Sequence, residues 1–264
     1  MQPQGLPPAI YLNRGVSFSL KKHRAKVMYN YNRSQKYDKG FLSQNFMGPN
    51  AILMLDEITQ DIELTTDMRV LDLGCGKGLT AIFLAKEYGA KTFAVDLWIS
   101  ATDNYKRFLQ MGVDDLVVPI HTDASIELPF AAEYFDALIS VDSYHYYGNN
   151  DDYFERHLKS LIKKGAPVAI AIPGTKYEMN GIIPDRLAPF LDDTGFATLH
   201  CIEWWTQILE KHLDNFSIKE MACSDAAWSD WLAADNPIAQ QDINMIKADN
   251  GKYLNLIAVT GNVK

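Results

Sequence analysis

Three glycines at alternate positions, Gly74, Gly76 and Gly78, stand between an apolar run at residues 68–73 and a helical pattern that begins at Leu79. This order predicts a strand, a tight turn and a helix. Glycine has no Cβ atom, so the backbone can take a positive φ angle and approach a ligand closely. The start of the helix would add unpaired N–H groups and a partial positive charge. The turn is therefore a candidate ligand-binding loop.

Two aspartates accompany this turn. Asp96 follows a second predicted strand at residues 91–95, and a carboxylate at the tip of that strand can accept hydrogen bonds from both hydroxyl groups of a ribose. Asp72 precedes the first glycine by two residues and suits a ligand with an ammonium group better than a pyrophosphate. A dinucleotide-binding turn has the spacing G-x-G-x-x-G, and Leu79 occupies the place of its third glycine.

The segment Leu71-Asp72-Leu73-Gly74-Cys75-Gly76-Lys77-Gly78 resembles the first motif of the class I S-adenosylmethionine (SAM)-dependent methyltransferases, and Asp96 falls where that family keeps its ribose-binding acid. The resemblance covers about residues 68–173. It implies SAM as the cofactor, S-adenosyl-L-homocysteine as the product, and an α/β fold: a Rossmann-like, seven-stranded, mostly parallel sheet with helices on both faces and the last two strands antiparallel. The cofactor-binding residues that it implies are Asp72, Gly74, Cys75, Gly76, Gly78, Asp96, Leu97, Trp98, Asp123, Ala124, Val141 and Tyr37.

Several of these residues have specific expected roles. Trp98 sits where the family packs an apolar side chain against the adenine. Thr122-Asp123-Ala124 resembles the second family motif, in which an acidic side chain accepts a hydrogen bond from the adenine amino group; a turn aspartate is the alternative. Tyr37, together with Phe46 and Met47, is a candidate to close the pocket, although ordinary core packing explains these residues equally well.

Polar and aromatic residues at 142–147 follow the predicted fourth strand. Ligands of open α/β sheets bind beyond the carboxyl ends of the strands, so this loop is expected to face the methyl group. His145 is the candidate general base, because an imidazole titrates near neutral pH. Tyr144 and Tyr146 are candidates to orient the acceptor or to hold a cationic amine by cation–π contact. The alternative for His145 is a hydrogen-bonded loop histidine.

Composition narrows the class of protein. The 264 residues are 47% hydrophobic, which is ample for one large α/β domain. No run of 18 apolar residues is present, so no stable membrane association is expected. The three cysteines show no C-x-x-C spacing, and their odd number argues against a disulfide framework and for a reducing cytoplasm. The scattered histidines give no metal site.

The net charge of −8 is unevenly distributed. Residues 1–40 hold eight basic residues and one acidic residue, a net +7, which leaves −15 for the remainder. An acidic body disfavours nucleic acid as a partner. The basic stretch at residues 21–26 could touch anionic lipid or RNA, but pairing with the acidic body is the preferred interpretation.

The expected organisation is a basic N-terminal arm or cap at residues 1–45 and a methyltransferase domain at residues 46–264, with a substrate-side insertion at about 175–214. Individual expectations include a short strand at 16–20, helices at 51–60, 154–161 and 226–234, and a fifth strand at 167–172 that ends at Pro173-Gly174. Asn50 and Ser224 are expected to cap the first and the last of those helices.

The predicted function is transfer of a methyl group from SAM to a small-molecule acceptor by in-line displacement. Two alternatives stay open: a lipid-directed enzyme of the cyclopropane-fatty-acid-synthase-like branch, and a regulatory protein that binds SAM without catalysis. A dehydrogenase is disfavoured by Leu79. The sequence leaves the acceptor atom and the oligomeric state open.

Overall fold

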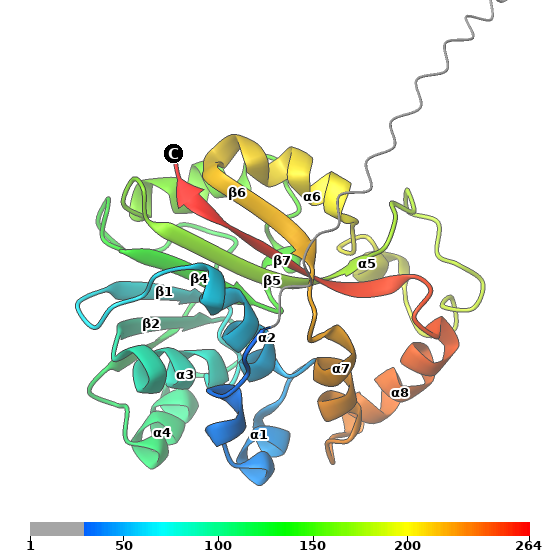
Figure 1. Ribbon diagram of the computed structural model, residues 1–264, viewed down its shortest axis with the longest axis horizontal. Coiled ribbons are helices and arrows are strands. Elements are labelled where there is room, and N and C mark those ends of the chain that lie inside the picture. Colours follow the sequence, from blue (N-terminus) through cyan, green and yellow to red (C-terminus); the bar gives the residue numbers. More distant parts are fainter. Residues whose placement is uncertain (1–28) are drawn as a thin grey trace, which may run out of the picture.

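A computed structural model describes residues 29–264, so the expected strand at 16–20 and the basic stretch at 21–26 lie outside the described residues. Seven strands of the described part form one sheet in the order β3-β2-β1-β4-β5-β7-β6 (Figure 1). The strands are β1 (Arg69–Leu73), β2 (Lys91–Asp96), β3 (Val117–His121), β4 (Ala137–Val141), β5 (Pro167–Thr175), β6 (Leu213–Glu220) and β7 (Leu254–Val263).

Strands β1 to β5 pair in parallel, whereas β7 runs antiparallel to both of its neighbours, β5 and β6. This is the predicted Rossmann-like sheet, and the prediction is confirmed. The helices are α1 (Lys39–Asn45), α2 (Ala51–Ile58), α3 (Leu79–Tyr88), α4 (Ala101–Met111), α5 (Asp193–Phe196), α6 (Ile202–Leu209), α7 (Ser224–Leu232) and α8 (Pro237–Asp249).

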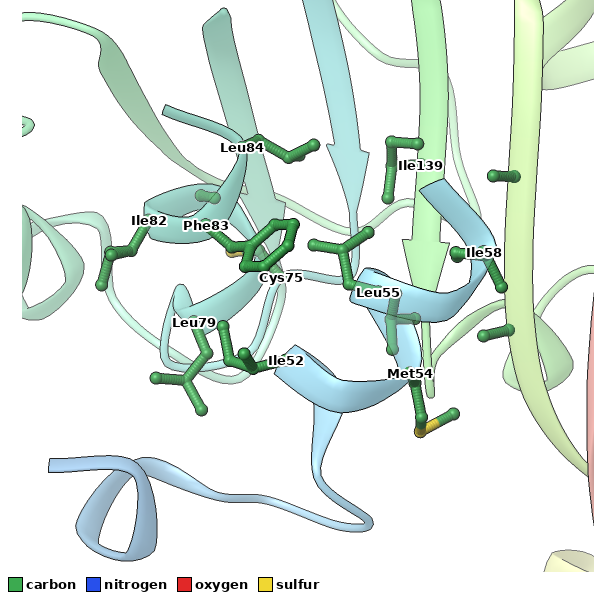
Figure 2. Packing of buried hydrophobic residues seen from close by; sticks show 14 of the residues in the cluster. Ile52, Met54, Leu55, Ile58, Cys75, Leu79, Ile82, Phe83, Leu84 and Ile139 are labelled. Atoms are coloured by element: carbon green, nitrogen blue, oxygen red, sulfur yellow. The ribbon is translucent and has the colours of Figure 1, made fainter. Parts of the chain in front are cut away.

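The sheet separates two apolar cores because successive side chains of a strand point to opposite faces. Val70 of β1 belongs to the core that α2, α3 and α7 cover, whereas Leu71 belongs to the core on the other face, with α6. Figure 2 shows side chains of α2, such as Leu55, directed toward Phe83 of α3 and Ile139 of β4. Strand β4 is buried along its whole length, as expected for a central parallel strand.

The described part of the N-terminal segment packs onto the domain. The Tyr37 ring stacks on Phe83 with centroids 5.9 Å apart, and Arg33 Nε lies 2.9 Å from Asp56 Oδ1 on α2. Lys36 forms an ion pair with Glu87 on α3. These contacts attach the described part of the segment to acidic side chains of the domain, whereas the interpretation of residues 21–26 as pairing with the acidic body remains a prediction.

Two local predictions were wrong. Strand β5 does not end at Pro173-Gly174 but continues to Thr175, because β7 pairs with it over that stretch and places Leu254 opposite Thr175. Ser224 does not cap α7: it is the first helical residue, and its hydroxyl donates to the Met221 carbonyl at 2.9 Å.

Other predicted elements shift in detail. The predicted helix at 154–161 is a π-helical turn at Phe154–Leu158 followed by a 3₁₀ turn at Lys159–Leu161. The expected cap of α2 is present, since Asn50 Oδ1 accepts a hydrogen bond from the Leu53 N–H at 3.1 Å. The helix after Asp96 begins at Ala101, with Ser100 as its cap.

Candidate cofactor and acceptor pocket

A cavity of about 930 Å³, including part of its open mouth, lies beyond the carboxyl ends of β1, β2 and β4. Its wall is made by the glycine turn, the tips of β2 and β4, the loop after β3 and the segment before α2. The lining residues are Asn45, Phe46, Met47, Gly48, Pro49, Ala51, Gly74, Cys75, Gly76, Lys77, Leu79, Thr80, Val95, Asp96, Leu97, Trp98, Asp123, Ala124, Val141, Asp142, Ser143, Tyr146 and Tyr147.

The Asp96 carboxylate is fixed at the tip of β2 by three backbone donors. Its Oδ2 accepts from the Gly76 N–H, and its Oδ1 accepts from the N–H groups of Trp98 and Ile99, each at 2.8 Å. A carboxylate has about four acceptor positions, so capacity remains for a ligand hydroxyl. Asp96 thus joins the glycine turn to the loop that carries Trp98.

The glycine turn requires residues without a side chain at two positions. Gly74 has a φ angle of +75°, and a Cβ atom there would lie 1.7 Å from the Ser143 hydroxyl. Gly78 has a φ angle of +78°, and its Cβ would lie 2.5 Å from the Phe108 ring. Neither position tolerates another residue without movement, which explains this part of the motif.

Some predicted cofactor-binding residues lie behind the wall. Asp72 is fully buried, and its Oδ2 accepts from the Thr80 hydroxyl at 2.6 Å. Burial raises the pKa of Asp72 to about 7. Gly78 shapes the turn without lining the cavity, and Tyr37 packs in the core against Phe83. Direct ligand contact by these three residues remains a prediction.

Five other residues that were expected to bind the cofactor do line the cavity: Leu97, Trp98, Asp123, Ala124 and Val141. The Trp98 side chain is 65% exposed, and its ring meets the Tyr146 ring edge-on at 5.5 Å. Asp123 Oδ1 accepts from the Ser125 N–H at 2.8 Å, and this bonding lowers the pKa of Asp123. The cavity wall thus includes both an aromatic surface and a fixed carboxylate.

The three predicted catalytic residues do not all face the cavity. Tyr146 lines the cavity, whereas Tyr144 and His145 do not. Tyr144 is buried against Trp205 with ring centroids 6.1 Å apart. His145 is 3% exposed and stacks on Tyr146 with centroids 4.0 Å apart, and its Nδ1 has no partner among the described residues. Burial lowers the pKa of His145 to about 3, so the ring is neutral at physiological pH.

Several lining residues were given no role in the sequence analysis, above all Asp142, Ser143 and Tyr147. The Tyr147 and Ser143 hydroxyls lie 2.8 Å apart, and the Tyr147 hydroxyl also donates to the Leu73 carbonyl at 3.2 Å. This network joins the tips of β1 and β4. Asp142 has a positive φ angle of 56°, a feature that no sequence signal marks at a non-glycine residue.

Within residues 29–264, no group of three or more His, Cys, Asp or Glu side chains is arranged to hold a metal ion. No helix of that part combines the length and apolar character that a membrane span requires.

Comparison with known proteins agrees with this geometry. Residues 70–165, which span β1 to the turn before β5, match a family model described as a methyltransferase domain. This match assigns a methyltransferase domain to residues 70–165. The family prediction made from residues 71–78 and Asp96 is therefore confirmed.

Individual relatives are distant. Methyltransferase GfsG of Streptomyces halstedii is 25% identical over 164 residues, which cover 62% of this chain and 54% of that protein. Glycine/sarcosine/dimethylglycine N-methyltransferase of Actinopolyspora halophila is 30% identical over 139 residues, which cover 51% of this chain and 24% of that protein. The methyltransferase domain thus matches only part of each longer relative.

A solved structure shares the fold. Geranyl diphosphate C-methyltransferase from Streptomyces coelicolor A3(2), in complex with geranyl diphosphate and S-adenosyl-L-homocysteine, superposes with a TM-score of 0.63 at 13% identity. The superposition covers 81% of this chain and 76% of that one.

The burial of His145 predicts acid sensitivity. Because folding lowers the pKa of this ring from 6.5 to about 3, the unfolded chain gains a proton below pH 6.5 that the native protein refuses. The neutral ring therefore costs no stability above pH 6.5. Below that pH the free energy of unfolding should fall, by about 2 kcal/mol at pH 5. Urea unfolding at pH 7 and pH 5 should show a smaller decrease for His145→Gln than for the wild type. His121→Gln, at an exposed position, is the control, and identical decreases in all three proteins would contradict the assignment.

Proposed function

We propose that this chain transfers a methyl group from SAM to a small-molecule acceptor and releases S-adenosyl-L-homocysteine. The observation that carries the proposal is the Asp96 carboxylate, fixed beside the glycine turn on the wall of one cavity. Asp96 would accept hydrogen bonds from the ribose hydroxyls. Trp98, Asp123 and Ala124 would hold the adenine, as the family resemblance implies.

Methyl transfer requires the protein mainly to position SAM and the acceptor. The nucleophile attacks the methyl carbon in line with the departing sulfur, the carbon–sulfur bond breaks, and its electron pair neutralises the sulfonium. Holding both reactants in this geometry and excluding water supplies much of the rate. The glycine turn gives the methionine part of SAM close access to the backbone. Asp142, Ser143, Tyr146 and Tyr147 line the remaining side, where the acceptor would enter.

The cavity supports an enzyme over a SAM-binding regulator, because the loop after β4 lines it and does not fill it. Two of the three proteins named above act on small molecules by their names: one on glycine, sarcosine and dimethylglycine, the other on geranyl diphosphate. Nothing in these comparisons favours a lipid-directed enzyme. A cytoplasmic location and the absence of a nucleic-acid partner remain predictions.

The proposal is tested by S-adenosyl-L-homocysteine formation. The purified chain would be incubated with SAM and a panel of small amines, alcohols, thiols and activated carbon acids, and the product measured by mass spectrometry. Acceptor-dependent product is the expected result. SAM binding without product from any acceptor would contradict methyl transfer to small molecules and favour the regulatory alternative.

A further inference from the structure

Asp142 is a carboxylate on the cavity wall, and its side chain has no partner among residues 29–264. It ends β4 with a φ angle of 56°, and its N–H donates to the Ala171 carbonyl at 2.7 Å. No hydrogen bond or ion pair to its carboxylate is made by any described residue. Its Oδ2 lies where a Cβ atom on Gly48 would be only 2.0 Å away. Asp142 therefore lies against the segment before α2, and its carboxylate is open to the cavity.

A second carboxylate lies behind it. Asp242 on α8 is partly buried, and its Oδ2 accepts from the Trp231 indole N–H at 2.7 Å. Burial, and then repulsion from Asp242, raises the pKa of Asp142 to about 8. Tyr146 is the other titratable group that faces this pair.

Among residues 29–264, no cation is paired with the Asp142 carboxylate at the cavity. Lys77 is the basic residue among those that line it, and its ammonium group donates to the Gln44 carbonyl at 3.0 Å. A ligand that brings a positive charge would favour the ionised form of Asp142 and would be attracted by it. An anionic acceptor at the same place would be repelled.

Aromatic rings complete the same side. Tyr146 and Trp98 are 52% and 65% exposed, meet edge-on at 5.5 Å, and both line the cavity. The face of such a ring attracts an ammonium group, and it also attracts the methylated ammonium product.

We propose that the acceptor is a small primary or secondary amine and that Asp142 binds its ammonium group and takes its proton. This inference rests on the proposed function. The ammonium group gives one proton to the Asp142 carboxylate, and the freed lone pair forms the new nitrogen–carbon bond. The carbon–sulfur bond of SAM breaks, sulfur keeps that electron pair, and the proton on Asp142 leaves to solvent. Asp242 is a positioning residue, because it acts only by raising the pKa of Asp142.

The first test compares amines with oxygen counterparts of similar size. Glycine, ethanolamine and benzylamine would be assayed beside glycolate, ethylene glycol and benzyl alcohol, with S-adenosyl-L-homocysteine as the readout. We expect product from at least one of the amines and from none of the oxygen compounds. The Asp142→Asn variant should react about 100-fold more slowly than the wild type, which is in the range expected for loss of general-base catalysis. Asparagine adopts positive φ angles readily, so the variant should fold. Asp214→Asn, on the exposed face of the edge strand β6, is the matched control and should keep the wild-type rate.

The pH profile separates proton transfer from a structural role. For a given amine, kcat/KM of the wild type should rise through about pH 8 as Asp142 ionises. Asp142→Asn should lack this rise. Asp242→Asn keeps an oxygen for the Trp231 N–H but removes the repulsion, so the rise should move to lower pH.

The failures are distinguishable. If calorimetry shows that the wild type does not bind SAM, the proposed function fails. If SAM binds but the oxygen compounds are methylated in preference, no amine reacts, or Asp142→Asn keeps the wild-type rate, the amine inference is overturned and the methyltransferase proposal stands or falls on the wider acceptor panel.

Discussion

Replacement of Asp96 by alanine should raise the dissociation constant for SAM by about 100-fold or more. The carboxylate would accept hydrogen bonds from the ribose, and bonds to charged groups are worth about 1.5–3 kcal/mol each. The same carboxylate also fixes the N–H groups of Gly76, Trp98 and Ile99, so its loss frees both loops that form the pocket wall. Titration calorimetry measures the effect directly.

Two controls make the Asp96 result interpretable. Asp96→Asn keeps one side-chain oxygen and should lose less affinity than the alanine variant. Thermal unfolding of both variants would show whether the fold persists. A folded Asp96→Ala protein with wild-type affinity would remove Asp96 from the cofactor site.

Replacement of Gly74 by alanine should destabilise the domain and abolish cofactor binding together. The new Cβ would lie 1.7 Å from the Ser143 hydroxyl at a φ angle of +75°, so the turn or the loop after β4 must move. Left-handed backbone costs a non-glycine residue about 1–2 kcal/mol, and overpacking adds about 1–3 kcal/mol. We expect a total loss of about 2–5 kcal/mol in the free energy of unfolding, measured by urea denaturation.

Gly112→Ala provides the matched control. Gly112 has a φ angle of +64°, yet nothing lies within 4 Å of an added Cβ. This variant should lose only the backbone part, about 1–2 kcal/mol, and should bind SAM normally. Equal losses for the two variants would mean that the contact with Ser143 has no energetic weight.

The cofactor half of the pocket was predictable because it is local in sequence. Strand β1, the glycine turn and α3 follow each other directly, and Asp96 ends the next strand. Apolar patterning and glycine spacing therefore suffice for this part. The path of β5 through Pro173 was not predictable in the same way, because its partner strand β7 begins only at Leu254.

The acceptor half depends on contacts between distant segments. The loop after β4 folds as a 3₁₀ turn at Tyr144–Tyr146, which directs Tyr146 to the cavity and places Tyr144 and His145 in the interior. A run of aromatic residues carries no signal for which of them faces outward. Asp242 reaches Asp142 only through the packing of α8, about 100 residues further along the chain. The sequence analysis therefore located this loop but missed Asp142.

Calorimetric titration of the wild-type chain with SAM, S-adenosyl-L-homocysteine and NAD tests the central claim most directly. We predict about micromolar binding of the first two ligands and no binding of NAD. Binding of NAD, or of none of the three, would contradict the assignment of the glycine turn and Asp96 to a SAM site.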